Sequence, residues 1–505
     1  MNILFVSPEV LPFAKTGGLA DVSSALPEAL NSLGHKCSII MPMYRKVREN
    51  GFHPSTLRSN IKVNLGQKKY TFNLLFLRHQ NTDVYFVDNK EFFDRDELYG
   101  TPKADYQDNA VRFAFFAKAI LSVINDIGKI DIIHCNDWQS SLLPLYLRIP
   151  LNPPFPKGEI SENPTFSKGE IGGFKTVFTI HNMAYQGLFD PNVMSSIDIP
   201  QDLFAMDKLE FYGKLNFMKA GIIYSDAVTT VSKGYAREIL TKEFGCGLDG
   251  LLRARMSSIS GILNGVDYTE WNPKTDKYIV KNYDAKGKGK IGGLDNKTEC
   301  KKALLKLFNL PFDDKKPVIG MITRLVGQKG LDLVAERIED IISLNTYFVL
   351  LGTGNEKYNS MFKDIANKYK NRTRIEIGFD NALAHKIEAG SDIFLMPSRY
   401  EPCGLNQMYS LKYGTVPVVR ATGGLDDTIS DFDPVTKKGN GFKFSEASGD
   451  ALFTVLKRAV GVYKDQKMWN TLRLNGMNCN FSWGNSAREY VKLYERIMST
   501  QPFIK

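Results

Sequence analysis

One short stretch in the second half of the chain combines residue types that suit a phosphorylated, hydroxyl-bearing ligand. The apolar run Asp392–Met396 predicts a buried strand, residues 401–404 a tight loop, and Leu405 the start of a helix. Cys403 and Gly404 would then lie at a helix N-terminus, where backbone N–H groups and the helix dipole favour a phosphate. Glu401 would accept hydrogen bonds from hydroxyl groups of the same ligand, which suggests a sugar nucleotide. The alternative is an ordinary strand–turn–helix connection with a solvated glutamate.

A glycine-rich loop follows the first predicted strand, Asn2–Val6. Lys15, Gly17 and Gly18 place one ammonium and several flexible amides between that strand and a helix. Such a loop could clamp a pyrophosphate. It matches neither of the common nucleotide-binding glycine motifs, so a turn without a ligand is the alternative.

Two cations follow another predicted strand, Pro317–Thr323. Arg324 and Lys329 share one strand-to-helix loop bounded by glycine, where a diphosphate leaving group would need positive charge. Solvated surface cations are the alternative. Phe379, at the end of the strand predicted from residue 374, could stack on a base, although an aromatic residue there is more often part of the core.

An acid and an imidazole end two further predicted strands. Residues 130–134 lead to Asp137, and the strand that begins at Lys175 leads to His181. A lone histidine at a strand end is more often structural than catalytic. Because parallel neighbours end at the same edge of a sheet, we expect Asp137 and His181 to lie close together there.

The elements that must position these residues alternate between strand and helix along the chain. This alternation predicts α/β domains with parallel sheets, and 505 residues favour two large domains. We expect helices over Leu209–Ile223 and Lys297–Leu307, and a last helix, Ala487–Met498, that closes the fold. The segment Ile259–Asp267 should end the first domain, and the lysine-rich loop beyond Trp271 should lead into the second.

Composition excludes several other classes of protein. Hydrophobic residues make up 43% and charged residues 24%, which is typical of a soluble globular protein. No apolar run is long enough to span a bilayer, and the N-terminus lacks the basic region of a signal peptide, so we expect neither. The six cysteines are scattered as in proteins with reduced thiols, which predicts a cytoplasmic location. Neither the cysteines nor the six histidines have metal-ligand spacing, so we predict no metal site and no cofactor. The net charge is +10, but the lysines are spread along the chain and much of the excess lies in loop-like segments such as residues 286–290, which favours a solvated basic surface over nucleic-acid binding.

A short repeat interrupts the first half of the chain. Residues 155–160, Phe-Pro-Lys-Gly-Glu-Ile, are echoed at 166–171 as Phe-Ser-Lys-Gly-Glu-Ile. Such Pro-, Gly- and Lys-rich copies cannot build a core and predict an inserted surface loop. A partner-binding loop is the alternative, and we assign the repeat no function.

Taken in order, these loops resemble the bacterial glycogen synthase and plant starch synthase family over almost the whole chain. Each matching motif is short, but together and in this order they are specific. The motifs are Lys15–Asp21, Thr179–Gly187, Phe217–Gly221, Leu263–Asp267, Thr323–Gly330, Ser398–Gly404 and Thr422–Asp426.

The resemblance implies the GT-B fold, in which two Rossmann-like domains face each other across a deep interdomain cleft. Its domains would cover 1–262, with an inserted loop at about 152–173, and 263–480; residues 481–505 would form a C-terminal helix that packs back on the first domain. It implies a hexosyltransferase that moves glucose from ADP-glucose to the non-reducing end of an α-1,4-glucan such as glycogen, with retention of configuration and release of ADP.

The resemblance also implies a role for each matching residue. Arg324 and Lys329 would neutralise the departing diphosphate, while Glu401 would hold the sugar, and Asp137 and His181 would face the sugar from the first domain. The remaining donor contacts would come from Lys15, Gly17, Gly18, Asp21, Asn264, Phe379, Cys403, Gly404, Leu405 and Asn406.

Some positions depart from close relatives, and other functions stay open. Cys135-Asn136 and Phe379 differ from the residues common at these places, Asn406 varies in the family, and the repeat at 155–171 has no counterpart. Phe379 in place of tyrosine leaves ADP-glucose versus UDP-glucose undecided. A related glucosyltransferase with another acceptor, a pyridoxal-phosphate-dependent glucan phosphorylase and a glucan-binding protein without turnover are the alternatives. The sequence does not indicate the oligomeric state.

Overall fold

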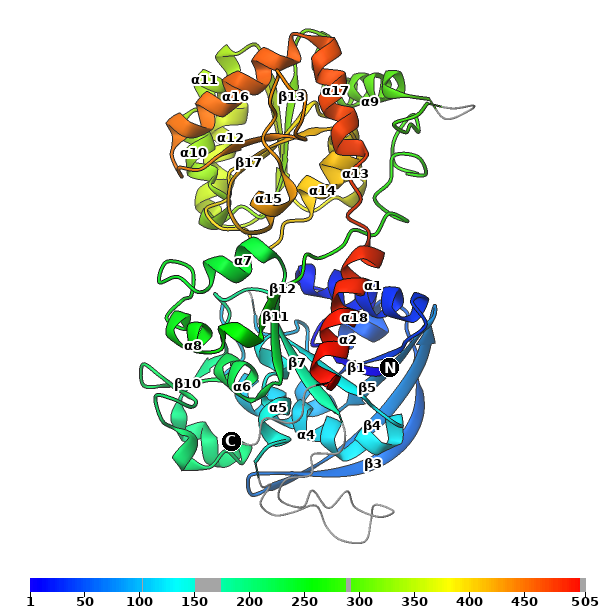
Figure 1. Cartoon of the computed structure of the whole chain (residues 1–505), viewed down its shortest axis with the longest axis vertical. Helices are drawn as coiled ribbons and strands as arrows, with labels where there is room; N and C mark the ends of the chain where they lie inside the picture. The colour runs from blue at the N-terminus through cyan, green and yellow to red at the C-terminus, as the bar shows by residue number, and fades with distance from the viewer. Residues whose placement is uncertain (102, 150–173, 288–291, 500–505) are drawn as a thin grey trace. The chain divides into compact units, whose positions relative to one another are not determined.

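A computed structural model describes residues 1–101, 103–149, 174–287 and 292–499 (Figure 1). The described chain divides into two compact units. The first holds Met1–Val231, Ala236–Gly265 and the chain from Trp483; the second holds Ser232–Tyr235 and Val266–Ser482.

The first unit is built on a nine-stranded sheet of described residues in the order β12-β11-β7-β6-β1-β2-β5-β4-β3. All neighbours from β12 to β5 are parallel, and β5, β4 and β3 form an antiparallel edge. The strands are β1 Asn2–Val6, β2 Lys36–Pro42, β3 Ser55–Leu65, β4 Lys68–His79, β5 Thr82–Asp88, β6 Ile132–Asn136, β7 Lys175–Ile180, β11 Ala227–Thr230 and β12 Ile259–Gly261.

The helices of the first unit lie between these strands and at the end of the chain. The last of them, α18, buries residues spaced three or four apart, including Tyr490 and Tyr494, as a helix with one apolar face does. It packs against α1, beside which it runs in Figure 1. The helices are α1 Gly18–Ser32, α2 Arg45–Glu49, α3 Lys90–Phe93, α4 Asn109–Ile127, α5 Leu142–Tyr146, α6 Phe217–Tyr224, α8 Asp249–Ala254 and α18 Trp483–Ser499; α7, Lys233–Glu238, begins in the second unit and ends in the first.

One predicted helix is wrong over half its length. Leu209–Ile223 contains a hairpin, β9 Glu210–Phe211 and β10 Lys214–Asn216, before α6 begins at Phe217. The two residues that join the strands, Tyr212 and Gly213, both have positive φ, 48° and 78°. Such a two-residue turn matches the twist of a hairpin and interrupts a helix.

The second unit contains a six-stranded, fully parallel sheet in the order β15-β14-β13-β16-β17-β18. Alternate residues of its strands enter different cores: Phe348 and Leu350 join a cluster with α10, α12 and α16, and Tyr347 and Val349 one with α9 and α13. Helices therefore cover both faces. The strands are β13 Val318–Ile322, β14 Tyr347–Gly352, β15 Thr373–Ile377, β16 Ile393–Met396, β17 Val416–Arg420 and β18 Phe442–Phe444. The helices are α9 Leu294–Leu307, α10 Leu331–Glu336, α11 Ile338–Ser343, α12 Glu356–Lys368, α13 Asn381–Gly390, α14 Asn406–Lys412, α15 Gly423–Thr428, α16 Gly449–Tyr463 and α17 Gln466–Met477.

Both sheets share one strand order when their parallel strands are numbered along the chain. Each follows 3-2-1-4-5-6, the doubly wound Rossmann order, and the first sheet adds a seventh strand at its edge. The order reverses between β1 and β6 in the first unit and between β13 and β16 in the second. Because ligands of such sheets bind beyond the carboxyl ends of the strands at this reversal, the loops after these four strands are where a site is expected.

No helix among the described residues is long and apolar enough to cross a bilayer.

Candidate active site

In the first unit, Asp137 and His181 lie side by side at the carboxyl ends of β6 and β7. These strands are parallel neighbours, and the backbone N–H of His181 donates to Oδ1 of Asp137 at 2.8 Å. This confirms the proximity predicted from the two strand ends. Asp137 has φ 53° and ψ 178°, a conformation rare for residues other than glycine. Strained backbone of this kind is concentrated at functional sites.

Asn136 determines which nitrogen of the His181 ring carries the proton. The amide nitrogen of Asn136 donates to the carbonyl of Val6, so its Oδ1 faces Nε2 of His181 at 3.0 Å. Burial lowers the pKa of His181 to about 3, which keeps the ring neutral near pH 7. Nε2 therefore carries the proton and donates to Asn136, and Nδ1 is left as an acceptor.

The carboxyl group of Asp137 is less acidic than usual. Burial raises its pKa to about 7, with a further contribution from the charge of Glu9 and opposition from the amides of His181 and Asn182. A carboxyl group that titrates near neutral pH can accept or hold a proton under working conditions. Strong perturbation of this kind is frequent at functional sites.

The predicted glycine-rich loop is held by a carboxylate that the sequence analysis did not single out. Glu9, 4% exposed, accepts hydrogen bonds from the amides of Thr16 and Gly17 at 2.6 and 3.1 Å. Helix α1 begins at Gly18, immediately after these amides. Lys15 is paired with Asp21 at 2.7 Å on the exposed side of the loop.

Asn264 lies beyond β12 and is 6% exposed. Its amide N–H donates to the carbonyl of Val231 at 3.4 Å. Its side-chain Oδ1 is buried without a hydrogen-bond partner among the described residues. An unpaired buried carbonyl costs free energy, so this oxygen is an acceptor prepared for a ligand or a water molecule.

In the second unit, Lys329 and Glu401 meet at the reversal of the sheet. The Nζ atom of Lys329, on the loop after β13, lies 2.6 Å from Oε2 of Glu401, on the loop after β16. The hydroxyl of Ser398 donates to the same oxygen at 2.9 Å. Because both contacts use Oε2, Oε1 remains an acceptor for a ligand hydroxyl.

Arg324 and Phe379 are exposed at the carboxyl ends of β13 and β15. The guanidinium of Arg324 makes no ion pair within the described part of the chain. Phe379 is 88% exposed, which excludes the core position that was its alternative. An exposed ring at a strand end is suited to stack on a planar group.

The loop 403–406 differs in one respect from the expected helix N-terminus. Helix α14 begins at Asn406, with Leu405 as its N-cap, so Cys403 and Gly404 lie just before it. Gly404 has φ 70°, which only glycine adopts without strain. The side-chain amide of Asn406 donates to the carbonyl of Ile322 at 2.8 Å and so joins the start of helix α14 to the end of strand β13.

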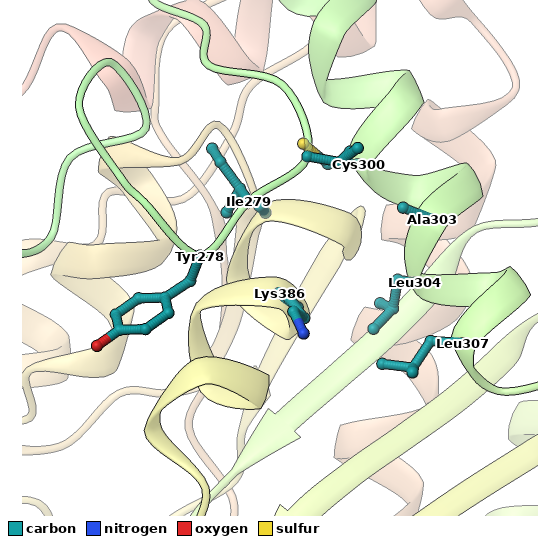
Figure 2. A pocket seen from close by; sticks show the side chains of 9 residues that line it. Tyr278, Ile279, Cys300, Ala303, Leu304, Leu307 and Lys386 are labelled. Atoms are coloured by element: carbon teal, nitrogen blue, oxygen red, sulfur yellow. The ribbon is translucent and has the colours of Figure 1, made fainter.

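A separate hollow of about 250 Å³ lies between α9, α13 and residues 278–280 (Figure 2). Its lining is mostly apolar, with Ala303 and Leu304 from α9 and Lys386 from α13. None of the predicted site residues contributes to it, so it is not the candidate active site. Among the described residues no cluster of three or more histidine, cysteine, aspartate or glutamate side chains is placed to hold a metal ion.

Glu9, Asn136 and Ser398 are the residues that the sequence analysis missed. Each acts on a predicted residue through a side-chain contact: Glu9 on the Lys15 loop, Asn136 on His181 and Ser398 on Glu401. All three stand within three residues of strand ends that the sequence had already marked, those of β1, β6 and β16, and this position is the one signal in the sequence that points to them.

Comparison with known proteins agrees with this architecture. Residues 2–254 match the family model of the starch synthase catalytic domain, and residues 305–470 match that of glycosyl transferases group 1. The chain is 47% identical over 501 residues to a glycogen synthase of Koribacter versatilis, covering 98% of each chain, and 45% identical to one of Geotalea daltonii, covering 99% of each.

Solved structures show the same fold. The catalytic domain of starch synthase IV from Arabidopsis thaliana, bound to ADP and acarbose, is 34% identical with a TM-score of 0.86 and 99% coverage of both chains. Sucrose-phosphate synthase from Thermosynechococcus elongatus, at 15% identity and a TM-score of 0.58, shares the fold alone. The chain therefore belongs to the starch and glycogen synthase family of GT-B glycosyltransferases.

Proposed function

We propose that the protein is a glycogen synthase. It transfers glucose from ADP-glucose to the non-reducing end of an α-1,4-glucan, with retention of configuration and release of ADP. The observation that carries this proposal is the Lys329–Glu401 pair at the reversal of the second sheet, because it supplies a cation for a diphosphate and an acceptor for sugar hydroxyls at one place. The full-length similarity to proteins named glycogen synthase supports it.

The proposed chemistry depends on charge that develops as the glucose–phosphate bond breaks. The sugar acquires oxocarbenium character while negative charge grows on the diphosphate. Arg324 and Lys329 stabilise that charge without having to reorganise. Glu401 accepts hydrogen bonds from the glucose hydroxyls through Oε1 and holds Lys329 through Oε2.

The first unit supplies the groups that contact the sugar and the donor's charged end. Asp137 accepts a hydrogen bond from a sugar hydroxyl, His181 presents its unprotonated Nδ1, and Lys15 contributes a further cation. Gly18, Asp21 and Asn264 belong to the same donor contacts. Retention in glycosidases commonly uses a carboxylate nucleophile; we assign none here, and propose reaction on one face of the sugar, with the leaving phosphate helping to deprotonate the acceptor.

The nucleotide contacts come from the second unit. Phe379 stacks on the adenine base, and the backbone of Cys403 and Gly404 holds the phosphate, with Leu405 and Asn406 completing this side of the loop. The exposure of Phe379 favours the stacking role.

Release of ADP or UDP from the two glucose donors, with and without glycogen, tests the proposal. Glycogen-dependent release of ADP is the expected result. Release of UDP from UDP-glucose, without release of ADP from ADP-glucose, would support the proposed chemistry but show that the donor nucleotide is UDP. Glycogen binding without release from either donor would show a glucan-binding protein in place of an enzyme.

A further inference from the structure

The carboxylate of Glu9 has a complete set of hydrogen-bond donors. Oε2 accepts from the amides of Thr16 and Gly17, and Oε1 accepts from the hydroxyls of Thr16 and Tyr99 at 2.6 and 2.8 Å. A carboxylate offers about four lone-pair positions. All four are used, and the residue is 4% exposed. Glu9 is therefore not placed to act as a base or to bind a sugar hydroxyl itself.

These hydrogen bonds change what the glycine-rich loop can offer to a ligand. The amides of Thr16 and Gly17 point to Glu9, so they are not available to a phosphate. The charge of Glu9 also lies at the start of α1, where it interacts favourably with the helix dipole and would repel a second anion. The clamp of loop amides predicted from the sequence is thus not formed by Thr16 and Gly17.

Lys15 remains available to an anionic ligand on this loop. Its side chain is 43% exposed, and its ammonium is paired with Asp21, whose side chain is 29% exposed. Exposed ion pairs of this type contribute little to stability. Lys15 can therefore exchange Asp21 for a phosphate at small cost, provided that the backbone of the loop is held in place.

We propose that Glu9 is a positioning residue for the donor, which fixes the backbone of residues 15–18 so that Lys15 reaches the donor's diphosphate. Tyr99 acts as a brace that keeps the Glu9 carboxylate in place from a segment 90 residues away. The inference rests on the proposed function, since it takes Lys15 as a donor contact.

The substitution Glu9→Gln disrupts the set of four hydrogen bonds to the side chain with little change in its shape. A glutamine offers one acceptor oxygen and one NH₂ group. At least one of the two pairs of donors, Thr16 N–H with Gly17 N–H or the Thr16 and Tyr99 hydroxyls, would then face the NH₂ group. A displacement of the loop by about 1 Å is enough to cost on the order of a hundredfold in rate.

A double-mutant cycle between Glu9→Gln and Lys15→Ala tests the proposal, with kcat/KM for ADP-glucose and the Kd of ADP as its two readouts. We expect Glu9→Gln to lower kcat/KM by about 30- to 100-fold in the native chain but by less than about threefold in the Lys15→Ala chain. Glu9→Gln should likewise weaken ADP binding in the native chain and have little effect on it in the Lys15→Ala chain. Equal factors in both backgrounds would overturn the proposal, because Glu9 would then act independently of Lys15.

Two further comparisons separate positioning from a general effect on folding. Glu28→Gln removes the same charge from α1 at a position where the Glu28 carboxylate makes no hydrogen bond or ion pair among the described residues, and it should leave both readouts unchanged. If Glu9→Gln fails to fold, the cycle is run with Tyr99→Phe, which removes one of the four hydrogen bonds and should cost about three- to tenfold. Full activity of Tyr99→Phe would contradict the proposed role of Tyr99 in holding the Glu9 carboxylate in place.

The outcome is distinguishable from failure of the proposed function. A native chain that binds ADP without turning over ADP-glucose would refute the synthase assignment, and the cycle would then be decided on ADP affinity. A native chain that neither binds ADP nor turns over the donor would refute both proposals.

Discussion

The Nζ atom of Lys329 lies 2.6 Å from Oε2 of Glu401, across the two loops at which the strand order of the second sheet reverses. The side chains are only 15% and 9% exposed. The pair is therefore assembled and partly desolvated in the chain itself, and removing one partner leaves the other charge uncompensated. A donor diphosphate would share Lys329 with Glu401 and would not have to recruit a flexible surface lysine.

Removal of the two cations should slow the chemical step. We expect Lys329→Ala and Arg324→Ala each to lower kcat by about a hundredfold or more, as for lost preorganised charge stabilisers. Steady-state ADP release with saturating glycogen measures this. Lys457→Ala, on an exposed position of α16, serves as control and should keep full activity. Near-normal rates in both variants would remove Arg324 and Lys329 from the mechanism.

Gly330 should be needed for the placement of Lys329. It has φ 65°, and a Cβ atom there would lie 2.1 Å from the carbonyl oxygen of Pro397. Gly330→Ala must therefore displace one of the two loops that carry Lys329 and Glu401. We expect a lower melting temperature together with at least a tenfold loss of kcat/KM, by the same reasoning as for a misplaced catalytic group.

Gly461→Ala is the matched control for that substitution. Gly461 lies within α16, and a Cβ atom there meets nothing within 4 Å. Because alanine favours the helix by about 0.5–1 kcal/mol over glycine, this variant should be more stable with unchanged activity. An unaffected Gly330→Ala variant would show that the two loops adapt freely.

Asp137 should lower the stability of the folded chain above neutral pH although it is needed for activity. Its pKa is raised to about 7 by burial and by Glu9, so the folded chain holds this proton more tightly than the unfolded chain, in which the carboxyl has its ordinary value of 3.8. The contribution of the group to stability therefore falls as the pH rises from about 4 through 7. Asp137→Asn, which has no such titration, should be more stable than the native chain at pH 8 by about 1–3 kcal/mol while losing most activity.

Urea unfolding at several pH values measures this difference. The advantage of Asp137→Asn should shrink toward pH 4, where the native carboxyl is protonated in the folded chain. Asp364→Asn, at an exposed position of α12, should show no pH-dependent advantage. A variant less stable than the native chain at pH 8 would contradict the burial of an uncompensated charge at Asp137.

The strands were predictable because most of them are buried on both faces. Parallel strands such as Ile393–Met396 are continuous apolar runs bounded by turn residues. The polar residues that follow three of these strands are Asp137, His181 and Glu401, which could therefore be selected as site residues. The hairpin at Tyr212 was not predictable, since its turn lacks the usual Asn-Gly pair and its strands are very short. Besides each other, they pair only with β8, Leu188–Phe189, among the described residues, and that strand pairs with β10.

The pairing of site residues could not be predicted from the sequence. Lys329 and Glu401 are 72 residues apart, and Glu9 and Tyr99 are 90 apart. The sequence shows which side chains stand at strand ends, but which of them meet depends on the order of strands in the sheet. Glu9 was missed because its position near a strand end is the only signal in the sequence, and its role appears only when the glycine-rich loop folds back onto it.

His385 is a buried histidine outside the candidate active site. The ring of His385 is stacked on Trp271 with centroids 3.9 Å apart, and its Nδ1 lies 2.8 Å from the carboxylate of Asp276. Asp276 also accepts a hydrogen bond from the hydroxyl of Tyr413 at 2.5 Å. Burial opposes the charge of His385, but its interactions with Asp276 and Glu270 outweigh burial and raise the pKa to about 9.

Protonated His385 should therefore stabilise the second unit in a pH-dependent way. Its pKa is raised above the ordinary value of 6.5, so the stabilisation is complete below about pH 6.5 and is lost as the pH rises through about 9. Breaking a buried pair by removing one partner costs about 3–5 kcal/mol. His385→Gln should thus be less stable than the native chain by about that amount at pH 6, and the gap should narrow by pH 10. Urea midpoints of the two chains at pH 6, 8 and 10 measure it; a gap that stays constant with pH would show that His385 is neutral and contributes through packing on Trp271 alone.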